Sequence, residues 1–168
     1  MSSSSLTSKS RYRDPFSGFS HLIAAIIGLI ASGVLIIKAS LYGDAWQIAS
    51  FAVLCICMIL MFGSSAIYHL AQGSDEKILT LKRIDHMAIF AMIAGTYTPM
   101  CLVPLRESFG WTLLFVVWGL ALAGILLKIF WINAPRWLST IIYLAMGWAC
   151  IFGISTMKEV MPEISFDW

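Results

Sequence analysis

The chain has 168 residues, of which 60% are hydrophobic and only 12% are charged. A water-soluble domain has about 25% charged residues, so this composition excludes an ordinary soluble domain and indicates a membrane protein. The net charge of +2 is small, and nothing in the sequence indicates a nucleic-acid partner. The partners that this composition predicts are membrane lipids.

Five apolar segments follow a serine-rich beginning. Residues 1–15 are predicted to be a disordered cytoplasmic tail, and residues 16–168 to be one transmembrane helical domain. A helix needs about 20 apolar residues to cross a bilayer. The sequence therefore predicts an all-α membrane bundle, with spans at about 20–37, 45–69, 84–103, 109–127 and 137–157.

The positive residues are distributed unevenly between these spans. With a cytoplasmic N-terminus, eight of them lie on the inside, namely Lys9, Arg11, Arg13, Lys77, Lys82, Arg83, Lys128 and Arg136. Three lie on the outside, namely Lys38, Arg106 and Lys158. Because cytoplasmic loops are enriched in lysine and arginine, this distribution predicts a multi-pass protein of the plasma (cell inner) membrane with its N-terminus in the cytoplasm.

Small residues within the spans are predicted to serve packing. Ala24, Gly28 and Ser32 form a ridge along one face of the first span, which suits close approach of another helix. The same ridge permits a homo-oligomer. The four cysteines are Cys55, Cys57, Cys101 and Cys150. We interpret them as small core residues rather than as disulfides or metal ligands.

Polar residues collect at the facing ends of the second and third spans. Ser65 and His69 are four residues apart and therefore lie on one helix face, and Asp85 and His86 follow at the start of the next span. Ionisable groups in membrane helices are costly and usually mark functional sites. With His21, all three histidines are predicted near the cytoplasmic leaflet. The pattern favours a polar, metal-binding site between helices.

Each of these residues also has an ordinary structural interpretation. His69 is a metal ligand or an interfacial histidine bonded to a loop carbonyl. Ser65 orients water or bonds back to its own helix. Asp85 binds metal, orients a histidine or acts as a general base, or is an acid favoured by the dipole in the first turn of its helix. His86 and His21 are interpreted as polar residues outside the site, and His86 is not expected to share a face with Asp85.

The motifs resemble the hemolysin III family, the bacterial branch of the progestin and adiponectin receptor (PAQR) superfamily. The resemblance rests on the Ser65-x-x-x-His69 pair, on Ser20-His21 followed by Gly28, and above all on the run DHMAIFAMIAGTYTP from Asp85 to Pro99. It extends over about residues 16–157.

The resemblance implies a seven-helix protein with a zinc ion near the cytoplasmic side. In the superfamily the zinc is held by the histidine of Ser-x-x-x-His and by two histidines of an H-x-x-x-H motif in the last helix. Carried over, His69 is a zinc ligand, Asp85 the acid that contacts the water on the zinc, and Ser65 a supporting hydroxyl. This sequence contains no H-x-x-x-H, so it is expected to lack the last two helices and to have an incomplete site.

Three functions follow as alternatives. The first is a zinc-dependent hydrolase of ceramide-type lipid amides, with Asp85 and Ser65 as catalytic residues and His69 as the metal ligand. The second is a non-enzymatic protein of membrane homeostasis or sensing, in which any metal is structural. The third is a cytolysin, which the sequence disfavours because no secretory signal is recognised and long apolar helices suit insertion into the cell's own membrane. Whether the chain is an enzyme stays open at this point.

Overall fold

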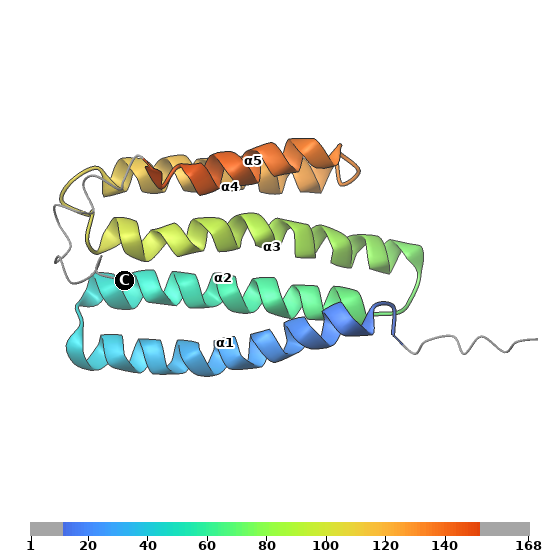
Figure 1. The fold of residues 1–168 in the computed structure, drawn as a ribbon, viewed down its shortest axis with the longest axis horizontal. Coiled ribbons are helices and arrows are strands. Elements are labelled where there is room, and N and C mark those ends of the chain that lie inside the picture. Colours follow the sequence, from blue (N-terminus) through green and yellow to red (C-terminus); the bar gives the residue numbers. More distant parts are fainter. Residues whose placement is uncertain (1–11, 152–168) are drawn as a thin grey trace, which may run out of the picture.

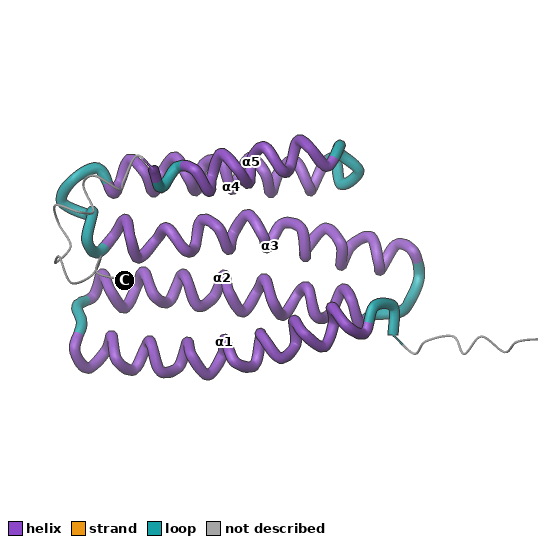
Figure 2. Tube along the Cα trace, viewed as in Figure 1, coloured by secondary structure: helices purple, strands orange, loops and turns teal. Residues whose placement is uncertain are grey.

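The computed structural model describes residues 12–151, in which all regular secondary structure is helical. The helices run in chain order as α1 Pro15–Tyr42, α2 Ala45–Leu70, α3 Asp75–Leu102, α4 Gly110–Phe130 and α5 Arg136–Trp148. Short segments at residues 43–44, 71–74, 103–109 and 131–135 connect them (Figure 2). The all-α prediction is confirmed.

The helices pack as antiparallel neighbours in chain order (Figure 1). Helix α1 packs against α2, α2 against α3, and α3 against α4, while α5 contacts both α3 and α4. One end of the bundle therefore holds the first residues of α1, α3 and α5 and the last residues of α2 and α4. His21, His69 and His86 all lie toward it, and we call it the histidine end.

Polar caps fix where the first three helices begin. The Asp14 carboxylate accepts a hydrogen bond from the Ser17 amide at the start of α1. Asp44 and Gln47 form a reciprocal capping box at the start of α2, and the Ser74 hydroxyl caps α3. These side chains satisfy amide groups that have no partner within the helix, so the chain reverses direction sharply between spans.

Helix α3 begins much earlier than the span predicted at 84–103. It starts at Asp75, because the Ser74 cap and the acidic residues Asp75 and Glu76 in the first turn stabilise a helix start in polar sequence. Asp85 consequently lies about three turns inside the helix. Its interpretation as a first-turn acid favoured by the helix dipole is therefore wrong.

Within residues 12–151, three helices have the length and composition to cross a membrane, namely α1, α2 and α4. The isoleucines on the outer face of α1 are exposed, among them Ile23, Ile27, Ile30 and Ile37. Apolar side chains on an outer surface are stable in lipid but not in water, so the bundle is built for a membrane. The predicted fifth span, 137–157, extends beyond the described residues, within which α5 ends at Trp148.

The core lies between α3, α4 and α5. Phe90, Val117 and Met146 have no exposed surface, and the Tyr97 hydroxyl donates a hydrogen bond to the Met146 carbonyl at 2.6 Å. Gly124 of α4 lies directly against the Phe90 ring. This packing fixes the rotation of α3 about its axis, and therefore the directions in which Asp85 and His86 leave that helix.

The small residues pack as predicted within the described bundle. Gly28 and Ser32 are buried, and Gly28 lies against Met58 of α2. The cysteines are free thiols, and three of them are buried as expected. Cys150 is exposed, so its interpretation as a core residue is wrong. Residues 1–11 of the predicted tail lie outside the described residues, whereas Arg13 and Asp14 contact α2 and Pro15 begins α1.

Candidate functional site

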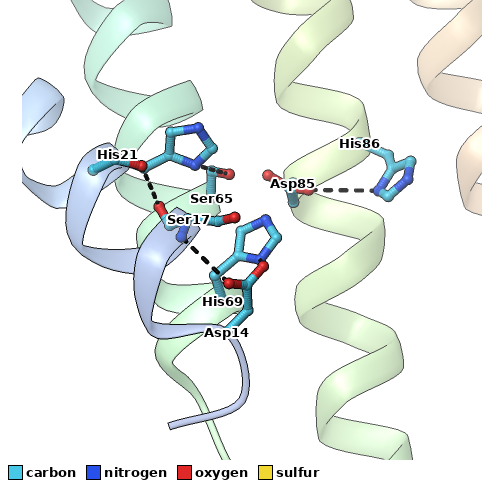
Figure 3. A network of polar contacts seen from close by, with 8 residues as sticks. Asp14, Ser17, His21, Ser65, His69, Asp85 and His86 are labelled. Atoms are coloured by element: carbon cyan, nitrogen blue, oxygen red, sulfur yellow. Dashed lines mark hydrogen bonds and ion pairs between the residues drawn. The ribbon is translucent and has the colours of Figure 1, made fainter.

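The polar cluster at the histidine end draws on the first three helices (Figure 3). His21 comes from α1, Ser65 and His69 from α2, and Asp85 from α3. Ser65 and Asp85 are buried, with 6% and 8% of their surface exposed. Polar side chains are expensive to bury in an apolar bundle unless they have partners, so the contacts among them determine what the cluster can do.

Ser65 contacts α1 rather than its own helix. Its hydroxyl lies 2.7 Å from Nδ1 of His21, which is the distance of a strong hydrogen bond. The His21 and His69 rings meet edge to face, with their centroids 5.7 Å apart. His21 therefore belongs to the cluster, although the sequence indicated only a polar residue near the helix start.

His69 is paired with the residue that caps α1. Its Nδ1 lies 3.3 Å from Oδ2 of Asp14, which is an ion-pair distance. The same nitrogen is buried without a partner of hydrogen-bond geometry. We therefore describe the contact as electrostatic rather than as a directed hydrogen bond. It holds the imidazole at a fixed place while leaving that nitrogen unsatisfied.

Asp14 is suited to this role because it is held as an anion. Hydrogen bonds from Ser17 lower the pKa of Asp14, and the adjacent His69 ring lowers it further, while partial removal from water acts in the opposite direction. The Asp14 amide also donates a hydrogen bond to the His69 carbonyl at 3.0 Å. The start of α1 is therefore attached to the end of α2 at this histidine by both backbone and side chain.

Asp85 and His86 leave α3 in different directions. Figure 3 shows Asp85 on the side that faces Ser65 and His69, and His86 projecting toward the other side. Their tips still approach, with Nδ1 of His86 at 3.6 Å from Oδ2 of Asp85. The same Nδ1 lies 2.7 Å from the Lys82 carbonyl, which can only accept, so this nitrogen carries the proton. His86 thus projects away from Ser65 and His69 but contacts the acid of the cluster.

The donor set fits part of a metal site. A histidine that binds metal through one ring nitrogen usually donates a hydrogen bond from the other to a carboxylate. Asp14 lies on that side of His69 at 3.3 Å, but without the geometry of a hydrogen bond. Asp85 adds a buried carboxylate. Within residues 12–151, however, no three His, Cys, Asp or Glu side chains gather closely enough to hold an ion. Any further ligands would have to come from outside these residues.

The sequence identified three of the four residues in the cluster, and it did not identify Asp14, which contacts His69. Ser65, His69 and Asp85 stood out because of their spacing and their place in apolar segments. His21 and Asp14 were missed because their contacts join different helices. The one sequence feature that could have indicated His21 was the placement of all three histidines toward one membrane face.

Comparison with known proteins agrees with this architecture. The sequence matches the family described as Haemolysin-III related over residues 9–167. It is 42% identical over 147 residues to a hemolysin-3 homolog of Bacillus subtilis (strain 168), covering 88% of this chain and 68% of that protein. It is 40% identical over 148 residues to hemolysin-3 of Bacillus cereus, covering 88% of this chain and 67% of that protein.

No solved structure matches the chain. The family assignment therefore rests on sequence, over nearly the whole length of the chain. It agrees with the all-helical bundle and its three apolar helices of membrane-crossing length. The chain is a multi-pass membrane protein of the haemolysin III family.

Proposed function

We propose that the cluster of Ser65, His69 and Asp85 is the chain's share of a zinc site that hydrolyses lipid amides. The observation that supports this most strongly is the buried Asp85 carboxylate, 8% exposed, on the side of α3 that faces Ser65 and His69 (Figure 3). A carboxylate inside an apolar bundle is costly to retain. A catalytic task explains why it is there.

Each residue of the cluster would have its own role in the reaction. His69 would bind zinc through the ring nitrogen that does not face Asp14, because Asp14 occupies its Nδ1 side at 3.3 Å. When bound, zinc activates water and polarises the amide carbonyl. Asp85 would accept a proton from the attacking water and deliver it to the leaving amine. Ser65, bonded to His21 at 2.7 Å, would hold that ring and orient water beside it.

The first test measures the zinc content of three proteins purified from their own membranes. These are the wild type, His69→Ala and His86→Ala. We expect zinc in the wild type and in His86→Ala and its loss from His69→Ala, because only His69 faces the cluster. Mass spectrometry of the metal and of the protein gives the stoichiometry. Equal zinc in the two variants would contradict the assignment of His69, and absence of zinc from the wild type would contradict the site itself.

A non-enzymatic role in membrane homeostasis or sensing is the second candidate. It is favoured by the number of ligands, because catalytic zinc usually has three protein ligands and residues 12–151 contain no such group. The two candidates differ in their product. Release of fatty acid from a ceramide-type amide in vesicles supports the hydrolase. Zinc that stabilises the protein without such release supports the structural role.

A lytic activity is suggested only by the names of the relatives, one of which is called hemolysin-3. Release of a trapped dye from red-cell ghosts by the purified protein measures it directly. We expect no release, because bundles with exposed apolar faces, such as that of α1, insert during synthesis rather than from solution.

We further propose that the histidine end faces the cytoplasm across the inner membrane. Lys77, Lys82 and Arg83 lie toward this end, in the first half of α3, whereas Lys38 and Arg106 lie toward the other. Positive residues are enriched on the cytoplasmic side of membrane proteins. The zinc site would then lie near the cytoplasmic leaflet.

Labelling with a membrane-impermeant thiol reagent tests this orientation. In a variant whose native cysteines are replaced by serine, we expect Arg106→Cys to react in spheroplasts and Lys77→Cys to react only after the membrane is permeabilised. Lys77 is exposed and Arg106 is partly exposed in the loop after α3, so both positions can meet a reagent that reaches their side of the membrane. The reverse pattern would place the histidine end outside.

A further inference from the structure

A second polar feature lies at the histidine end, on the side of α3 away from Ser65. It is a partly open cavity of about 750 Å³ lined by residues of α3, α4 and α5, with Tyr68 of α2 also on its lining. Its lining includes Lys82 and His86 of α3, Lys128 of α4, Asn133 in the following loop and Ser139 of α5. We call it the lysine cavity. The proposed zinc site does not use its two lysines.

The positive charges in this cavity have no ion-pair partner within the described part of the chain. Lys82 and Lys128 both line it, and no carboxylate does. Neither lysine has a carboxylate at ion-pair distance among residues 12–151. Asp85 is the nearest acid along α3, and it approaches His86, which also lines the cavity, but it is not at ion-pair distance from either lysine.

Lys128 is the unusual member, because only 4% of its surface is exposed. A buried ammonium group is costly unless an opposite charge lies beside it. Its place in the last turn of α4 is favoured by the helix dipole, but that effect offsets only part of a full charge. A second lysine on the same cavity raises the cost further, because like charges repel more strongly where water is scarce.

The cavity also presents an unused hydrogen-bond donor. Ser139 is 6% exposed, and its hydroxyl oxygen is buried without a partner. The Asn133 amide lies on the same wall. Two ammonium groups with neutral donors beside them form the arrangement that binds phosphate oxygens. Basic pockets between transmembrane helices at the level of the headgroups bind anionic lipids in this way.

We propose that the lysine cavity binds the phosphate group of an anionic phospholipid through Lys82 and Lys128, with Ser139 as a hydrogen-bond donor. The cavity lies where α4 ends and α5 begins, which is the depth at which lipid phosphates lie in a bilayer. A bound headgroup would tie α3, α4 and α5 together at this end. It would also sit beside His86, whose Nδ1 contacts Asp85 at 3.6 Å.

The test is thermal unfolding of the purified, delipidated full chain in detergent, with phosphatidylglycerol, phosphatidylcholine or inorganic phosphate added. Lys128→Met removes the buried charge at similar volume. Lys38→Met is the matched control, because Lys38 is exposed near the other end of the bundle. Lys82→Met is a second variant at a half-buried position, in case Lys128→Met does not fold.

We expect phosphatidylglycerol to raise the unfolding midpoint of the wild type and of Lys38→Met. In Lys128→Met or Lys82→Met, the lipid concentration needed for half of that shift should rise at least about tenfold, because one charge-assisted contact is lost. A lysine-dependent shift with inorganic phosphate alone would support the site and assign it to free phosphate. Equal shifts in all variants, or equal effects of phosphatidylcholine and phosphatidylglycerol, would overturn the proposal. Neither zinc nor hydrolysis enters this readout, so it fails or succeeds independently of the proposed activity.

Discussion

Under the proposed hydrolase function, substituting Asp85→Asn is expected to lower the rate of amide hydrolysis by about 10²–10⁴-fold, the usual contribution of a positioned general base. Asparagine has nearly the same shape as aspartate but cannot accept the proton of the attacking water. Asp85 is buried and lies about three turns inside α3, so no neighbouring acid of that helix replaces it. Fatty-acid release from vesicles that contain a ceramide-type amide measures the effect.

Two controls separate this role from a structural one. Asp75→Asn makes the same chemical change on the same helix at an exposed position in the first turn, and we expect it to leave the rate unchanged. Zinc content should stay close to that of the wild type in Asp85→Asn, unlike in His69→Ala. An Asp85→Asn protein that is folded, holds zinc and keeps full activity would contradict the role given to this carboxylate.

Gly124→Ala is expected to destabilise the described bundle strongly through a single added methyl group. A Cβ atom at this position would overlap the ring of Phe90. Phe90 has no exposed surface and packs against Tyr143 with a centroid distance of 4.5 Å, so its ring has nowhere to move. Overpacking of this kind typically costs about 1–3 kcal/mol of unfolding free energy.

Gly119→Ala provides the comparison on the same helix. A Cβ atom at Gly119 meets nothing within 4 Å, and alanine favours helix over glycine. We therefore expect this variant to be as stable as the wild type or slightly more stable. Unfolding in mixed detergent micelles, followed by circular dichroism, ranks the three proteins. Equal stability of the two variants would show that α3 and α4 do not pack as closely as described here.

Close packing at Gly124 is also expected to affect the lysine cavity but not the Ser65–His21 contact. The Phe90 ring lies one turn of α3 beyond His86, and its contact with α4 sets how near Lys128 comes to Lys82 on the wall of the lysine cavity. A forced separation of α3 from α4 should therefore weaken lipid binding as well as stability. The Ser65–His21 contact joins α1 and α2, and it should survive that change.

Features that depend on local pattern could be predicted from the amino-acid sequence. Apolar length predicts helices and a membrane, because a bilayer requires about 20 apolar residues whatever packs around them. The spacing of Ser65 and His69 places both on one helix face, because the helical repeat is fixed by the backbone. Those predictions agree with α2 as the structure describes it.

Which helix faces meet could not be predicted in this way and follows from the packing of the folded chain. Asp14 reaches His69, and His21 reaches Ser65, because α1 packs along α2 in one particular register. Lys82 and Lys128 line one cavity because α4 returns antiparallel to α3 at the distance set by Gly124 and Phe90. Contacts of this kind join residues far apart in the chain, and they depend on side-chain shape along whole helices. No short-range pattern in the sequence encodes that shape.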